Sequence, residues 1–214
     1  MFTKTLLPDT LRAIQLVSDV AEIKKAYLAG GTALALQLGH RISVDLDFFT
    51  INKFSETEFS SKLAKIPEFK EDRIAEWTIL GKVGETKFSM FYYNYPLLEE
   101  SAVFEKINLA SLADIAAMKI HAIEQRGTRR DFVDVYFLSQ KYTLGQMLDF
   151  YKKKYEADLD RLYVAIRALD YFEDAEQEDE MPKMLTPVTW EEVKEFFRKE
   201  TKRLAKDKLG IPNN

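Results

Sequence analysis

Two short segments constrain the fold most: a glycine pair, Gly30-Gly31, and two aspartates one residue apart, Asp45 and Asp47. Apolar residues before the glycines predict a short strand, and the residues after them predict a helix. The aspartates stand in an apolar run that predicts a second strand, in which alternate side chains project to the same face. Two neighbouring carboxylates repel each other unless a cation lies between them. The combination predicts a site for phosphates and a divalent cation, and therefore phosphoryl or nucleotidyl transfer.

The composition is that of a globular protein, with 46% hydrophobic and 31% charged residues in a chain of 214. The absence of cysteine excludes disulfides, thiolate metal sites and a thiol nucleophile. The two histidines, His40 and His121, are too few for a histidine-rich zinc site, and we interpret them as packing or surface residues. No apolar run approaches the about 20 residues of a membrane span, and no signal pattern opens the chain. We therefore expect a cytoplasmic protein without membrane contact.

The net charge of −4 argues against broad, charge-driven binding to nucleic acid. A local basic groove remains compatible with this charge, and the candidates for it are Arg126, Arg129, Arg130 and the lysines at 152–154. A run of lysines usually belongs to a solvated surface, and we interpret 152–154 in that way.

The pattern of the first half predicts helices and strands in alternation. The expected helices span 8–23, 32–38 and 55–66, and the expected strands span 26–29, 43–51, 73–80, 87–93 and 103–109. A glycine-containing turn at 81–84 is expected to join two of these strands in a hairpin. In the strand that carries the aspartates, the residues expected in the core are Val44, Leu46 and Phe48.

From residue 111 onward the pattern is helical. Helices are expected from 111 to the break at Gly127, and over 130–139, 143–154, 158–171 and 189–206. We therefore expect an α+β protein of two domains, a mixed-sheet domain at 1–110 and a helical domain at 111–214 that completes the cleft.

The glycine pair and the aspartate pair each have an alternative interpretation. The glycine pair suits phosphate binding because glycine lets an anion approach the free amides at a helix start. It also suits an ordinary tight turn, since neither a Walker loop nor G-x-G-x-x-G is present. The aspartates could instead form a structural ion pair with Arg41 or a lysine. Ser43 has the same strand parity as the aspartates and, like Arg41, could contact a phosphate.

A third group of charged residues lies in the helical half, namely Lys119, Arg126, Arg130 and Asp131. Lys119 and Arg126 are two helical turns apart and therefore project from one side of a helix. Such cations can neutralise the charge that develops on a phosphoryl group during transfer, and Asp131 could orient one of them. The alternative is a salt-bridge network between two helices.

Together these motifs resemble those of the AbiEii/AbiGii nucleotidyltransferase toxins, within the DNA polymerase β-like superfamily. The resemblance spans residues 27–139 and rests on two signatures. They are Gly30-Gly31-Thr32-Ala33-Leu34 with Arg41-x-Ser43-x-Asp45-x-Asp47-Phe48, and Lys119-x-x-Ala122-x-x-x-Arg126-x-x-x-Arg130-Asp131-x-x-Asp134.

The resemblance implies a small mixed-sheet nucleotidyltransferase core with flanking helices, followed by a helical half. It implies that Asp45 and Asp47 bind Mg²⁺ or Mn²⁺ and act in catalysis with Lys119 and Asp131. The residues implied to hold the nucleotide are Gly30, Gly31, Thr32, Ser43, Arg126 and Arg130. The implied co-substrate is an NTP, either GTP or another, and the implied acceptor is a hydroxyl of tRNA, other RNA or protein. A toxin of this kind also implies a cognate antitoxin and a role in toxin–antitoxin or phage-defence systems.

The sequence departs from the superfamily's pattern at the usual third carboxylate. The strand expected to carry it contains no acidic residue, and Glu85 and Glu105 are the candidate substitutes. The departure motivates an alternative function, a catalytically weak nucleotide-binding module that acts through a partner protein. A third hypothesis is a scaffold of structural ion pairs without a nucleotide.

Overall fold

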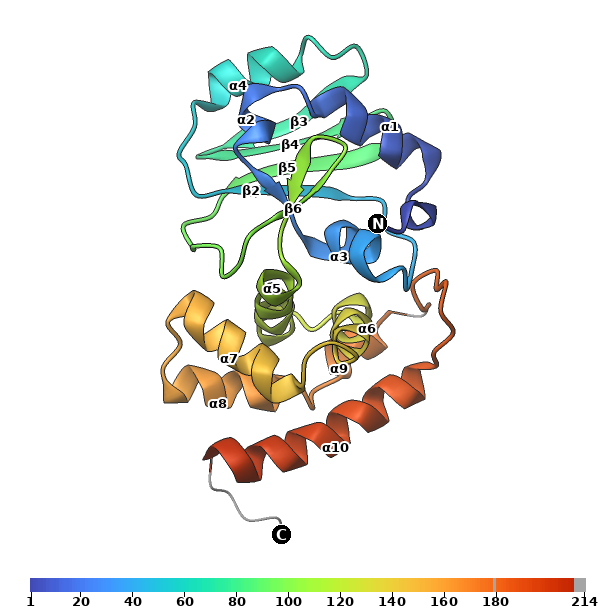
Figure 1. Ribbon diagram of the computed structural model, residues 1–214, viewed down its shortest axis with the longest axis vertical. Coiled ribbons are helices and arrows are strands. Elements are labelled where there is room, and N and C mark those ends of the chain that lie inside the picture. The colour runs from blue at the N-terminus through green and yellow to red at the C-terminus, as the bar shows by residue number, and fades with distance from the viewer. Residues whose placement is uncertain (179, 210–214) are drawn as a thin grey trace. The chain divides into compact units, whose positions relative to one another are not determined.

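The chain divides into two compact units, Met1–Ser111 and Leu112–Asn214, of which the computed structural model describes residues 1–178 and 180–209. The first unit is a seven-stranded mixed sheet with helices, and the described part of the second is helical (Figure 1). The predicted α+β class is therefore confirmed. Within the described residues, no helix is both long and apolar enough to cross a membrane.

The strands of the sheet follow the order β3-β4-β5-β2-β1-β7-β6. Their bounds are β1 Tyr27–Leu28, β2 Leu46–Thr50, β3 Phe69–Ala75, β4 Thr78–Val83, β5 Thr86–Tyr92, β6 Ala102–Phe104 and β7 Ile107–Leu109. β2 lies between β1, its antiparallel neighbour, and β5, its parallel neighbour. This register places Asp47 opposite Ser89, and Phe49 opposite Phe91.

The two faces of the sheet in the first unit are covered by different helices (Figure 1). The helical segments are η1 Thr3–Thr5, α1 Pro8–Val17, α2 Ala21–Lys24, α3 Gly30–Leu38 and α4 Glu56–Leu63. Figure 1 shows α1, α2 and α4 on one side of the sheet and α3 on the other. The core face is aromatic, since the ring of Phe88 lies 5.7 Å from that of Phe48 and 6.5 Å from that of Phe59. Asp47 and Ser89, of opposite parity, therefore belong to the other face.

Local sequence signals account for the ends of the helices nearest the aspartate strand. α3 ends at Gly39, which has φ 76° in the left-handed region that glycine tolerates best. α4 begins after Ser55, whose hydroxyl accepts a hydrogen bond from the Glu58 amide at 3.3 Å. Both predicted boundaries are confirmed.

The predictions of three elements are wrong. In the structure each of these elements is interrupted, and the interrupting residues include no glycine or proline that would have indicated a turn. The helix expected over 8–23 is two helices, since α1 ends at Val17. The strand expected over 73–80 is divided by a turn at Trp77, and the strand over 103–109 by a turn at Glu105 and Lys106. These three turn residues have φ values of 45°, 46° and 65°, which non-glycine residues seldom adopt.

The expected hairpin turn at 81–84 is also wrong. Gly81 lies inside β4, and the hairpin turn is formed by Gly84 and Glu85. A Cβ on Gly81 would collide with the Lys70 carbonyl of β3 and lie 3.1 Å from the Phe69 ring. Gly81 therefore permits close strand packing rather than a turn.

In the second unit, α5 packs against α6, α7 and α8. The helices are α5 Leu112–Gln125, α6 Arg129–Leu138, α7 Leu144–Tyr155, α8 Leu159–Ala168, α9 Glu173–Glu176 and α10 Trp190–Leu209. A buried ion pair joins α5 to α7, with Lys154 Nζ 2.7 Å from Asp114 Oδ1 and both side chains 0% exposed. The prediction that the lysines at 152–154 belong to a solvated surface is therefore wrong for Lys154. Lys152 and Lys153 are exposed, as expected.

Candidate active site

The glycine pair begins α3 directly beside the aspartate segment. Gly30 has φ +65°, and a Cβ at this position would lie 3.4 Å from Asp47 Oδ2. A Cβ on Gly31 would collide with Arg41 Nη2 and lie 3.1 Å from Ser43 Oγ. The first amides of a helix have no acceptor within the helix, so they are free to bind an anion. Any anion bound there would lie close to the Asp47 carboxylate.

The substitution Gly30→Ala is expected to lower the free energy of unfolding by about 1–2 kcal/mol, because a Cβ is strained in the left-handed region. It is also expected to weaken NTP binding, because the new methyl group would crowd Asp47. Gly39→Ala is the matched control, since it strains the other end of the same helix at φ +76°. Urea denaturation and NTP titration measure the two effects. Equal losses of NTP affinity in both variants would contradict a phosphate site at Gly30.

Thr32 fixes the segment that precedes β2. Its hydroxyl is buried, donates to the Asp45 carbonyl at 2.6 Å and lies 3.0 Å from Ser43 Oγ. Backbone hydrogen bonds hold the same region, from Ala29 N–H to the Asp47 carbonyl at 3.0 Å and from Ser43 N–H to the Thr5 carbonyl at 3.0 Å. The Thr32 side chain therefore positions Asp45, and its backbone amide belongs to the first turn of α3.

The two aspartates are half-buried, and solvent reaches both. Asp47 lies in β2, whereas Asp45 precedes the strand by one residue, because β2 begins at Leu46 rather than at 43 as expected. The core prediction is confirmed for Leu46 and Phe48, which are 0% exposed, and is wrong for Val44, which is 37% exposed. Alternation applies only within the strand, and Val44 lies outside it.

Neither candidate substitute for the third carboxylate accompanies the aspartates. Ser89 occupies the position opposite Asp47 on β5. Glu85 lines a separate cavity with Arg12 and Glu68, and Glu105 lies in the turn between β6 and β7. Across residues 1–178 and 180–209, no group of three histidine, cysteine, aspartate or glutamate side chains is arranged to hold a metal.

The donor set at Asp45 and Asp47 nevertheless fits a divalent cation that shares its ligands with a substrate. Mg²⁺ prefers oxygen ligands and is commonly bound by one or two carboxylates together with substrate phosphates. The amides that begin α3 lie beside Asp47 and could hold those phosphates. The residues present therefore suit a metal bound with a nucleotide rather than a metal enclosed by protein ligands.

In the second unit, a buried lysine joins two aspartates. Lys119 Nζ of α5 lies 2.8 Å from Asp131 Oδ1 and 2.6 Å from Asp134 Oδ2 of α6, and the three side chains are 9%, 2% and 0% exposed. Thr128 donates a hydrogen bond to Asp131 Oδ2 at 2.6 Å. The charged hydrogen bond predicted between Asp131 and Lys119 is present, and it is also a salt bridge between two helices. Thr128 was missed, although a threonine three residues before an aspartate at a helix start is a recognisable capping signal.

Burial raises the pKa of Asp131, but the charge and hydrogen bond of Lys119, with the Thr128 hydroxyl and Arg126, outweigh burial and hold that pKa below its ordinary value. A lowered folded-state pKa stabilises the fold above the unfolded-state pKa of about 3.9, and this contribution is lost as the pH falls through the folded-state value. We expect the free energy of unfolding to fall below about pH 4 with a shallower slope in Asp131→Asn than in the wild type. Denaturation at a series of acidic pH values measures the slopes, and identical slopes would contradict this role of Asp131.

The three arginines near this cluster have different surroundings. Arg126 is 69% exposed, and its Nε lies 3.6 Å from Asp131 Oδ2. Arg129 instead donates to the Ala175 carbonyl at 3.2 Å, and its guanidinium lies 5.2 Å from the centre of the Trp190 ring. Arg130 is exposed. The structure thus brings Arg126, and not Arg129, to the lysine–aspartate cluster.

Both histidines have structural surroundings. His40 is buried. His121 Nδ1 lies 2.9 Å from Glu124 Oε2, the oxygen that also accepts a hydrogen bond from Tyr151 at 2.8 Å. Burial and this hydrogen bond to Glu124 raise the pKa of Tyr151.

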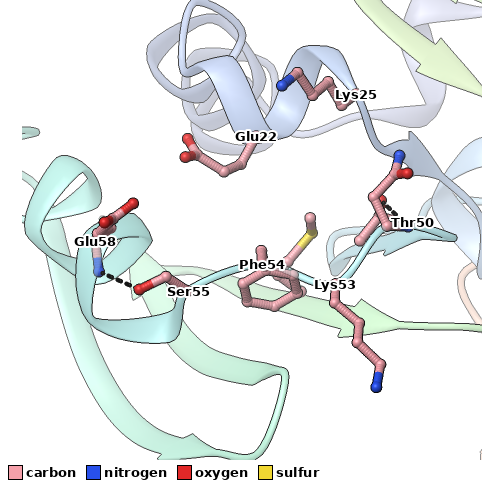
Figure 2. A pocket seen from close by; sticks show the side chains of 9 residues that line it. Glu22, Lys25, Thr50, Lys53, Phe54, Ser55 and Glu58 are labelled. Atoms are coloured by element: carbon pink, nitrogen blue, oxygen red, sulfur yellow. Dashed lines mark hydrogen bonds between the residues drawn. The ribbon is translucent and has the colours of Figure 1, made fainter.

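A polar pocket of about 500 Å³ lies at the far end of β2, where Thr50 ends the strand (Figure 2). Its charged lining residues are Glu22, Lys25, Lys53 and Glu58. Glu22 Oε1 accepts a hydrogen bond from Lys62 at 2.5 Å, while the buried Oε2 has no hydrogen-bond partner among the described residues. None of the predicted site residues lines this pocket, so it is distinct from the aspartate site.

Comparison with known proteins gives a matching family model and a relative. A family model described as the nucleotidyl transferase AbiEii toxin of type IV toxin–antitoxin systems matches residues 12–90 and 93–208. An uncharacterised protein of Aquifex aeolicus (strain VF5) is 36% identical over 208 residues, which cover 93% of this chain and 97% of that protein.

Two solved structures share the fold. One is MenT4, a nucleotidyltransferase toxin of Mycobacterium tuberculosis H37Rv, with a TM-score of 0.56 and 14% identity over 90% of this chain and 81% of that chain. The other is a Helicobacter pylori protein assigned as a nucleotidyltransferase, with a TM-score of 0.52 and 17% identity over 96% of each chain.

Proposed function

Because the chain belongs to the AbiEii nucleotidyltransferase toxin family, we propose that it transfers a nucleotide from an NTP to an RNA hydroxyl in a divalent-metal-dependent reaction. The family assignment makes the protein a nucleotidyltransferase of a toxin–antitoxin system. The metal, the acceptor and the roles of individual residues are the proposed parts.

The observation that carries the proposal is the position of Gly30, at which a Cβ would lie 3.4 Å from Asp47 Oδ2. This closeness supports the proposal because a helix start that suits phosphate lies beside one of the two carboxylates. Gly30, Gly31 and the Thr32 amide would hold the β- and γ-phosphates, and Ser43 would donate to a phosphate oxygen. Asp45 and Asp47 would hold Mg²⁺ or Mn²⁺, which supplies charge neutralisation at the phosphates when bound.

In the proposed step, the acceptor oxygen forms a bond to the α-phosphorus while the bond from that phosphorus to the bridging oxygen breaks. Pyrophosphate leaves, and the hydroxyl proton passes to water. Lys119 is the proposed cationic residue that stabilises the developing negative charge. Asp131, at 2.8 Å, holds the Lys119 ammonium group in place, and Arg126 and Arg130 would assist in binding the nucleotide.

The proposed donor is GTP or another NTP, and the proposed acceptors are tRNA or other RNA, with a protein hydroxyl as the alternative acceptor. A cognate antitoxin in the cytoplasm is the proposed protein partner. Incubation of the protein with labelled NTPs, Mg²⁺ and either total RNA or cell protein tests the activity and identifies the acceptor. Transfer of label that is lost in Asp45→Asn supports the proposal, and the absence of transfer to any acceptor contradicts it.

Among the described residues, no group of three side chains is arranged to hold a metal, and this favours a second candidate, a nucleotide-binding module that acts through a partner protein. Calorimetry separates the two functions. NTP binding in the presence of Mg²⁺ without turnover on any acceptor would favour the module. A failure of NTP and Mg²⁺ to raise the melting temperature would favour the third hypothesis, a scaffold of structural ion pairs, because a ligand that binds only the folded state must stabilise it.

A further inference from the structure

We propose that the sheet face around Ser89 binds the single-stranded end of the acceptor RNA, with its phosphates on a row of three lysines and its bases on a neighbouring group of aromatic rings. The lysine row consists of Lys70, Lys82 and Lys87, and the aromatic group of Phe49, Phe91, Tyr93 and Tyr95. This inference rests on the proposed nucleotidyl transfer and adds to it the place of the acceptor.

The lysine row is set by strand register. Lys70 of β3 pairs with Lys82 of β4, and Lys82 pairs with Lys87 of β5. Paired residues project to the same face of a sheet, and all three lysines are exposed. None of them forms a salt bridge with another residue in the described part of the chain. Like charges directly opposite each other repel and destabilise a sheet. A bound polyanion would offset this repulsion, so the row suits the phosphates of a nucleic acid.

The aromatic group lies on the same face, further along the strands. Lys87, Ser89 and Phe91 alternate along β5, and Phe91 is opposite Phe49 of β2. The ring of Phe49 lies 5.5 Å from that of Phe91 and 5.2 Å from that of Tyr93, which lies 4.9 Å from the ring of Tyr95. All four are half-buried, so their rings are partly open to solvent. Stacking on such rings binds unpaired bases with little dependence on sequence.

The strand order places this surface on the acceptor side of the aspartates. In phosphoryl transfer the attacking and leaving oxygens are roughly in line on opposite sides of the phosphorus. The glycine pair follows β1, on one side of β2, so the leaving pyrophosphate belongs on that side. The attacking hydroxyl must then approach from the other side of β2, where Ser89 of β5 lies opposite Asp47. On β5, Ser89 lies between Lys87 of the lysine row and Phe91 of the aromatic group.

Binding of a fluorescein-labelled single-stranded RNA of about ten nucleotides, measured by anisotropy without NTP, tests the proposal. Tyr93→Leu and Phe91→Leu are each expected to raise the Kd about fivefold to hundredfold, and Tyr93→Phe is expected to retain binding because it keeps the ring. Tyr92→Leu is the matched control. It removes a ring from the adjacent residue, which has opposite parity and packs 5.2 Å from Trp77. A blunt-ended RNA duplex, whose bases are paired, is expected to bind more weakly than the single strand.

The lysine row has its own readout in the salt dependence. Lys82→Gln is expected to reduce the slope of the logarithm of the RNA-binding constant against the logarithm of the salt concentration by about 0.7. The matched control is Lys65→Gln, because Lys65 is exposed and follows α4, outside the lysine row. In the transfer reaction, both sets of variants should raise the KM for RNA and leave the KM for NTP unchanged.

Four results would overturn the proposal: no RNA binding by the wild type, unchanged binding in Tyr93→Leu and Phe91→Leu, an equal loss in Tyr92→Leu, or a raised KM for NTP instead of RNA. The last result would show that the rings hold the base of the donor. Transfer that persists to a protein acceptor would leave the proposed nucleotidyl transfer intact, and RNA binding without transfer would contradict that function alone.

Discussion

Asp47→Asn is expected to lower the rate of nucleotide transfer at least about a hundredfold, the scale observed when one charge-stabilising group is removed from an active site. Asparagine retains the size of the side chain but removes the negative charge that a divalent cation requires. Asp47 is the aspartate nearest the start of α3, so its loss affects both the metal and the phosphates proposed to share it. Initial rates with labelled NTP and saturating Mg²⁺ measure the effect.

Asp72→Asn is the matched control, because it makes the same chemical change at an exposed residue of β3 in the same sheet. Its rate should equal that of the wild type. A folded Asp47→Asn protein that retains the full rate would remove Asp47 from the proposed mechanism, and thermal unfolding of both variants establishes that each is folded.

Lys154→Met is expected to lower the free energy of unfolding by about 3–5 kcal/mol, because it removes the ammonium group that offsets the charge of the buried Asp114 carboxylate. Lys154 and Asp114 are both 0% exposed and lie 2.7 Å apart, so neither charge is solvated when its partner is removed. Urea denaturation measures the change. The double variant Lys154→Met/Asp114→Leu should recover most of the loss, since an apolar pair of similar volume can replace a buried ion pair.

The neighbouring substitution Lys153→Met provides the control, because Lys153 is exposed and surface changes usually stay within about 0.5 kcal/mol. A Lys154→Met protein as stable as Lys153→Met would show that the buried pair contributes nothing to the fold. A double variant less stable than either single variant would point to further interactions of these two residues.

The fold could be predicted where the local pattern and the tertiary structure agree. α3 ends at Gly39 and α4 begins after Ser55, both as expected, because the capping chemistry of a helix end is local. The turns at Trp77 and Glu105 could not be predicted, because their backbones are held in left-handed conformations by the surrounding sheet and not by their own residue types. Gly81 misled for the opposite reason, since its small size serves strand packing and not a turn.

The candidate site could be predicted only as separate groups of residues. The sequence pairs Asp45 with Asp47 through strand parity, and Lys119 with Arg126 through helical spacing. It cannot show that Gly30 adjoins Asp47, that Asp134 shares Lys119 with Asp131, or that Ser89 lies opposite Asp47, because these contacts depend on strand order and helix packing. The lysine row could not be predicted because it depends on strand register, and the turn expected at 81–84 placed Lys82 in the turn rather than opposite Lys87.

The charged outer strand limits the ways in which another protein can bind this sheet. β3 lies at one edge of the sheet, and its central residues Lys70, Glu71, Asp72 and Arg73 are all exposed. A break in the register between Glu71 and Arg73 interrupts the row of backbone groups that an added strand would need. Charges and irregularities of this kind prevent edge-to-edge association. An antitoxin is therefore not expected to add a strand along β3, and the toxin itself is protected against growth into a larger sheet at this edge.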